Sequence, residues 1–149
     1  MDAAELSQLM QLRYDTLSEL LRISDAQIAA IAENRMSDLM RILSDKQQPI
    51  ARLSEIGQRL ATAAQDDPQQ RQWPDEASRL RCREQQDQCD RMHQDLLAIE
   101  ADCEVRLEQS RTEIQEKLQR FDSGRNAATR YAQSQPAPAR RGQLDLSSD

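Results

Sequence analysis

The chain has 149 residues, of which 31% are charged and only 3% are aromatic. This length suits one domain, and the shortage of aromatic side chains favours a long, thin apolar contact between helices over a compact aromatic core. The net charge of −6 argues against binding to nucleic acid or to anionic membrane surfaces, because both attract basic faces.

The N-terminus, MDAAELSQLM, has neither the basic region nor the apolar region of a signal peptide. No stretch of the chain approaches the run of about 18 apolar residues that a membrane-spanning helix needs. The odd number of cysteines fits a reducing compartment better than a set of disulfides. The sequence therefore predicts a soluble cytoplasmic protein.

Apolar residues at helical spacing predict a first helix over residues 4–33, with polar gaps at Arg13 and Ser24. A polar segment over residues 33–38 interrupts this pattern. Asn34 is suited to end the first helix, and Ser37 is a plausible N-cap for the next one. The apolar positions of the first helix are Leu6, Leu9, Met10, Leu17, Leu20, Leu21, Ile28 and Ile31.

A second helix follows, and the steps of its inward stripe alternate between four and three residues, as in a coiled coil. Lys46 and Gly57 are the weak members of that stripe. Proline inside a helix costs about 3 kcal/mol, so Pro49 predicts a kink near residues 46–49 or a new helix start there. The predicted inward stripe is Leu39, Leu43, Lys46, Ile50, Leu53, Gly57, Leu60 and Ala64.

Residues 66–74 form the clearest loop, because two prolines and a polar run end the second helix. Trp73 is expected to pack this loop onto the end of the helical bundle. A third helix is predicted from Asp75 to Gln135, about 90 Å long, with Gly124 as its one weak point. Residues 136–149 are rich in Pro, Ala, Ser and Gly and predict a disordered tail, which leaves a helical domain over residues 1–135.

All three cysteines and the single histidine lie between residues 81 and 103. Cys82, Cys89 and Cys103 share one heptad position with Leu96, so they are predicted to be small apolar residues in a packing contact. Residues seven apart on a helix are about 10 Å apart, so one helix cannot gather these thiols around one metal ion. His93 and Cys89 are the only pair that could touch a metal together. With no phosphate-binding loop and one histidine, we expect no metal, no cofactor and no enzyme activity.

The third predicted helix is about twice as long as either of the first two, which form an antiparallel pair. Its N-terminal half is expected to pack on that pair through Cys82, Cys89, Met92, Leu96, Ile99 and Cys103. Its C-terminal half keeps an apolar stripe, formed by Leu107, Ile114, Leu118, Phe121, Ala128 and Tyr131. Such a stripe predicts a partner site, flanked by Arg125 and Arg130. Two alternatives are a helix that bends near Gly124 and folds back, and a stripe that forms a homodimer.

These patterns together predict an all-α fold: an elongated antiparallel helical hairpin or coiled-coil bundle of three helices, the third the longest. At this level the sequence resembles the flagellar export chaperones of the FlgN type, over about residues 5–133. Three features carry the resemblance: the polar break at residues 33–38, the stretch "LMRILSDKQQPIARLSEI" around a lysine, and the stretch "LQRFDSGRNAATRYAQ", with its glycine before a tyrosine. Pro49 departs from the smooth second helix of that family.

The resemblance implies a cytoplasmic chaperone that binds the C-terminal helices of hook-associated (junction) proteins and delivers them to the type III export apparatus. The hypothesised partner-binding residues are Ile114, Leu118, Phe121, Arg125, Ala128 and Tyr131. The chain is then a monomer or a homodimer without membrane insertion. Two alternatives stay open: a structural coiled-coil adaptor or self-associating scaffold without an export role, and a FliT-like chaperone that serves the filament cap.

Overall fold

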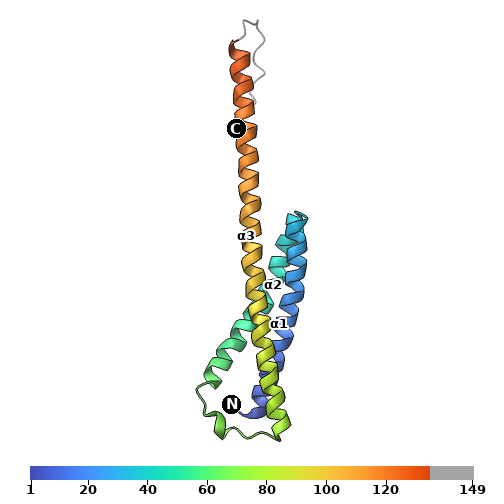
Figure 1. Cartoon of the computed structure of the whole chain (residues 1–149), viewed down its shortest axis with the longest axis vertical. Helices are drawn as coiled ribbons and strands as arrows, with labels where there is room; N and C mark the ends of the chain where they lie inside the picture. The colour runs from blue at the N-terminus through green and yellow to red at the C-terminus, as the bar shows by residue number, and fades with distance from the viewer. Residues whose placement is uncertain (135–149) are drawn as a thin grey trace. The chain divides into compact units, whose positions relative to one another are not determined.

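The computed structural model describes residues 1–134, which form three α-helices and one short 3-10 helix and contain no strand (Figure 1). The elements are α1 (Ala3–Ala32), α2 (Met36–Ala63), η1 (Pro68–Gln70) and α3 (Glu76–Ser134). The predicted all-α fold, with the third helix the longest, is confirmed. The predicted tail at residues 136–149 lies outside the described residues.

Contacts along the chain define two units. Unit 1 is Met1–Leu107 and holds α1, α2, η1 and the first part of α3. Unit 2 begins at Glu108, and its described part, residues 108–134, is the remainder of α3. α3 is continuous through Gly124, so the alternative in which the helix folds back at this residue is wrong.

A capping box starts α1, one residue earlier than predicted. The Asp2 carboxylate accepts a hydrogen bond of 2.8 Å from the backbone N–H of Glu5, and the Glu5 carboxylate accepts one of 3.1 Å from the backbone N–H of Asp2. Two of the backbone donors that a helix start leaves free are satisfied in this way. The sequence signal is an Asp followed three residues later by a Glu.

A tight turn joins α1 to α2. Asn34 has a φ of 56°, the left-handed conformation that often ends a helix, as predicted. The N–H of Arg35 donates to the carbonyl of Ala30 at 2.8 Å, and the N–H of Asn34 donates to that of Ile31 at 3.2 Å. These two bonds form a Schellman motif, and in Figure 1 α2 runs back alongside α1.

The prediction that Ser37 caps α2 is wrong. Because the Schellman motif closes the turn within two residues, α2 already begins at Met36, and Arg35 occupies the N-cap position without a side-chain cap. The Arg35 guanidinium instead binds the carboxylates of Glu33 and Asp38, each at 2.6 Å, which ties the turn to the first turn of α2.

α2 is a single helix through Pro49, so the predicted restart near this residue is wrong. Proline removes one backbone hydrogen bond, but its ring is buried in the core here and contributes apolar contact in return. The inward face also differs from the predicted one. The residue one position earlier is buried in place of each of Leu43, Ile50, Gly57 and Ala64. The buried residues are Leu39, Ile42, Lys46, Pro49, Ile56 and Ala63.

The difference between the predicted and the observed inward face of α2 arises because the helix offers two apolar rows. α2 carries two adjacent apolar rows one residue apart, and both have helical spacing. The core uses the row with Ile42 and Ile56, whereas Leu43 is half-buried and Ile50, Gly57 and Ala64 are exposed.

Replacing Gly57 with alanine is expected to stabilise the protein by about 0.5–1 kcal/mol. Gly57 lies inside α2, where glycine is less favourable than alanine, and an added Cβ at this position meets no atom within 4 Å. Chemical denaturation of the two proteins measures the difference. A loss of stability would show that Gly57 is in close contact and that the corrected face of α2 is wrong.

The core of unit 1 consists of two apolar clusters, to which all three helices contribute. α3 supplies four buried residues, Cys82, Cys89, Leu96 and Cys103, which are the predicted heptad positions. Met92 packs against the first cluster and Ile99 against the second, as expected. Trp73 is partly buried against the first cluster, which confirms that it packs the loop onto the bundle.

Candidate partner-binding surface

The three cysteines are free, buried thiols. Cys89 is fully buried, and its Sγ lies 4.0 Å from the backbone carbonyl of Met10 on α1. Burial raises the pKa of the thiols of Cys82, Cys89 and Cys103 above the ordinary value for cysteine. Within residues 1–134, no group of three or more His, Cys, Asp or Glu side chains is arranged to hold a metal ion. The thiols therefore act as small apolar packing groups.

A disulfide reagent such as DTNB is expected to react slowly with the native protein at pH 8 and to release three equivalents per chain after denaturation. The raised pKa keeps each thiol protonated, and the thiolate is the reactive form. Absorbance at the reagent's product band measures both rates. Rapid reaction of the native protein would show that the contact between α3 and the helix pair is open.

One buried cation lies in unit 1. Lys46 on α2 is only 3% exposed, and its ammonium donates to the Gln27 side chain of α1 at 2.7 Å and to the Glu100 carboxylate of α3. Burial lowers the pKa of Lys46, whereas these two acceptors stabilise its charged form. This polar cluster links all three helices at one level of the bundle. The two acceptors stabilise the fold, because a buried ammonium without partners would be energetically costly.

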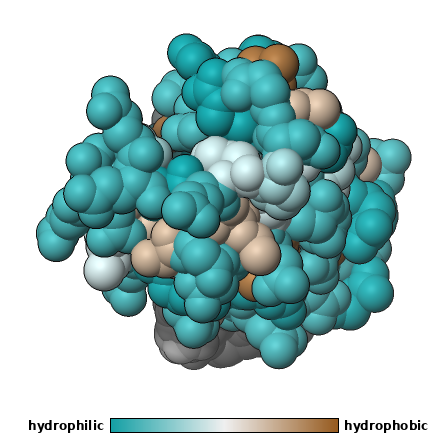
Figure 2. All heavy atoms as spheres, turned by 90° about the horizontal axis from the view of Figure 1, so that it is seen from below, coloured by the Kyte–Doolittle hydropathy of each residue, from teal (hydrophilic) through white to brown (hydrophobic). Residues whose placement is uncertain are grey.

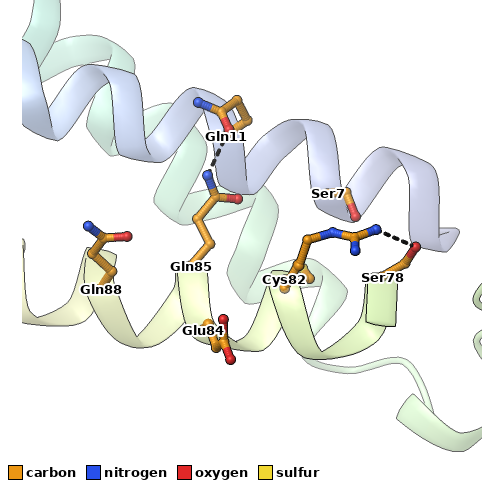
Figure 3. Close-up of a pocket in the computed structure, with 8 residues that line it drawn as sticks. Ser7, Gln11, Ser78, Cys82, Glu84, Gln85 and Gln88 are labelled. Atoms are coloured by element: carbon orange, nitrogen blue, oxygen red, sulfur yellow. Dashed lines mark hydrogen bonds between the residues drawn. The ribbon is translucent and has the colours of Figure 1, made fainter. Parts of the chain in front are cut away.

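A shallow cavity of about 560 Å³ lies between α1 and the first turns of α3 (Figure 3). Most of its lining is polar: Gln85 donates to Gln11 at 2.7 Å across the two helices, and Arg81 donates to Ser78 at 3.0 Å. The rest of the lining is formed by Ser7, Cys82, Glu84 and Gln88. Its mostly polar residues form no continuous apolar row of the kind that a partner helix would bury.

The surface at one end of unit 1 is mainly hydrophilic. Figure 2 views the end that carries the N-terminus and η1, and the hydrophobic areas seen there are small and separated by hydrophilic side chains. An exposed apolar row lies on α2, where Met36, Met40 and Ile50 follow the face that the core does not use. No helix within residues 1–134 is both long and apolar enough to cross a membrane.

The residues predicted from the sequence to bind a partner lie in unit 2, whereas Leu107, the first residue of the predicted apolar stripe, lies in unit 1 and packs against the second core cluster. Ile114, Leu118, Phe121 and Tyr131 are each more than half exposed, with values from 52% to 67%. Arg125 and Ala128 are exposed as well. None of these side chains belongs to an apolar cluster of the core. Large apolar side chains exposed in a row on one helix are typical of a surface that binds a partner.

Helical geometry shows how these residues are arranged around the axis of α3. At about 100° per residue, Ile114, Leu118 and Ala128 lie within about 60° of Phe121 around the helix axis. Tyr131 is about 80° away and borders the row. Arg125 lies beside Phe121, with its guanidinium carbon 5.9 Å from the ring centroid, at the outer limit of a cation–π contact.

The positions of two cations around the helix differ from the sequence-based prediction. Arg130 is nine residues from Phe121, which places it about 180° around the helix, so it does not flank the row. Lys117, which the sequence reasoning missed, is about 40° from Phe121 on the side opposite Arg125. Its position four residues before Phe121 is the signal that would have found it. We call Ile114, Lys117, Leu118, Phe121, Arg125 and Ala128 the unit 2 face.

Comparison with known proteins adds a decisive observation: a family model described as FlgN protein matches residues 1–138. The chain belongs to the FlgN family. The resemblance drawn from the helical pattern is therefore confirmed, and the chain is a flagellar export chaperone of the FlgN type. The FlgN family is one of chaperones and not of enzymes. No curated protein and no solved structure shows a significant match to the chain.

Proposed function

We propose that this chaperone acts in the cytoplasm, where it binds the C-terminal helices of hook-associated (junction) proteins and delivers them to the type III export apparatus. The binding site is the unit 2 face together with Tyr131 at its border. One observation carries the proposal: the large apolar side chains of unit 2 are more than half exposed although they lie in a row on a regular helix.

A helix is the client that fits this row best. The anchors Ile114, Leu118 and Phe121 follow the i, i+4, i+7 spacing by which two helices pack side by side. From Ile114 to Ala128 the row is about 21 Å long, which matches about four turns of a client helix. An amphipathic client helix would cover the exposed apolar surface and would hide its own apolar face before export.

A binding experiment separates this function from the two alternatives. The purified chain is mixed with a synthetic peptide of a junction-protein C-terminal helix and, separately, with one from a filament-cap protein. Sedimentation equilibrium is expected to show a 1:1 complex with the junction peptide. A complex with the cap peptide alone would instead indicate a FliT-like chaperone. Self-association of the chain without either complex would indicate a scaffold.

A further inference from the structure

The charge of the C-terminal part of unit 2 differs from that of the chain as a whole. Residues 117–134 hold four cations, Lys117, Arg120, Arg125 and Arg130, against a single acid, Asp122. The whole chain has a net charge of −6. Positive charge is therefore concentrated on the part of the helix that carries the exposed apolar row from Leu118 onward.

The two cations nearest to Phe121 lie on opposite sides of this residue around the helix axis: Lys117 is at one edge of the row, and Arg125 is between Ile114 and Leu118. Lys117 and Arg125 each lie about 40° from Phe121 around the helix, whereas the nearest acids, Glu113 and Asp122, lie about 80–100° away. Lys117 makes no ion pair with any residue between 1 and 134, and Arg125 reaches Asp122 only at 4.0 Å. Both cations are thus available to a partner that lies over the row.

We infer that the partner of the unit 2 face is an amphipathic helix that carries Asp or Glu on both sides of the apolar residues that cover Phe121. Such a helix places one acid beside Lys117 and another beside Arg125 while its apolar residues cover Phe121. The acids fix the register of the client and raise its association rate more than they add affinity. This inference rests on the proposed function and names the chemistry that its client needs.

A second copy of this chain fits the face poorly. If two copies crossed antiparallel at Phe121, Lys117 of one would lie opposite Arg125 of the other, since both are four residues from Phe121. In a parallel pair each cation would lie opposite its own counterpart. Like charges opposed across an apolar contact are unfavourable, so the face favours an acidic partner over itself.

The test uses two synthetic amphipathic helical peptides with the same apolar stripe, one flanked by Glu and the other by Lys. Each is titrated into the full-length chain by calorimetry at low and at high salt. The Glu-flanked peptide is expected to bind about five- to tenfold more tightly at low salt, because two attractive exposed pairs replace two repulsive ones. High salt is expected to reduce that difference, since it screens exposed charges.

Charge reversal supplies the matched control. The double substitution Lys117→Glu and Arg125→Glu is expected to invert the preference, whereas Arg130→Glu, on the opposite side of α3, is expected to preserve it. Equal binding of the two peptides, or an equal effect of Arg130→Glu, would overturn the inference. If a junction-protein peptide still required Phe121 in that case, the proposed function would stand without the acidic flanks. Failure of both peptides to bind would overturn the inference as well.

Discussion

Replacing Phe121 with alanine is expected to weaken binding of a junction-protein C-terminal peptide by about 1–2 kcal/mol or more, which is about 5- to 30-fold in Kd. Phe121 is at the centre of the unit 2 face, and aromatic anchors at the centre of an interface usually contribute most. Because its side chain is 64% exposed in the free protein, its loss removes little packing from the fold. Titration calorimetry measures the affinity, and circular dichroism measures the helix content, which is expected to stay unchanged.

Arg22→Ala is the matched control for this experiment. Arg22 is an exposed side chain of α1 in unit 1, outside the proposed site, so its removal is expected to leave binding unchanged. Normal binding by Phe121→Ala, or equal weakening by both substitutions, would place the client elsewhere. The exposed row of α2, with Met36 and Met40, would then be the next surface to test.

Replacing Ile56 with alanine is expected to lower the free energy of unfolding by about 2–5 kcal/mol, whereas Ile50→Ala is expected to cost well under half as much. The two residues have the same chemistry and lie on the same helix. Ile56 is 2% exposed in the core, and Ile50 is 45% exposed on the other apolar row of α2. Denaturant unfolding followed by circular dichroism measures both losses.

This pair decides which row of α2 faces the core. If Ile50→Ala were the more damaging substitution, the row predicted from the sequence would be correct and the observed packing of α2 would be wrong. Equal losses would mean that both rows are buried, for example in an oligomer. The same measurements at several protein concentrations would reveal the oligomer, since its stability depends on concentration.

Helix positions and the cysteine contact could be predicted because the sequence signals for them are strong and local. Breaks near Asn34 and Pro68 mark the helix ends, and Cys82, Cys89, Leu96 and Cys103 repeat at seven-residue spacing in the first part of α3. The exact start of α1 could also have been predicted, because Asp2 and Glu5 have the spacing of a capping box.

The inward face of α2 was harder to predict than the helix positions, since two adjacent rows satisfy the same spacing rule. The choice between them depends on contacts with α1 and α3, which lie far away in sequence. Burial of Gln27 and Lys46 has a similar cause: these polar residues enter the core because Glu100, 54 residues beyond Lys46, reaches the ammonium.

The apolar row of the candidate site was visible in the sequence, but its charged border was not placed correctly. The sequence-based prediction has both Arg125 and Arg130 flank the apolar stripe. Angles around the helix axis instead put Arg130 on the opposite side and bring Lys117 next to Phe121. Residues three, four and seven apart share a face, whereas a residue nine apart does not.

The central claim is that the client helix lies on the unit 2 face. Hydrogen exchange of the full-length chain, measured by mass spectrometry with and without a saturating junction-protein peptide, tests it most directly. Binding is expected to slow exchange most strongly across residues 110–132, where the exposed helix has little tertiary contact to protect it. Protection confined to unit 1, with unchanged exchange across residues 110–132, would contradict the account.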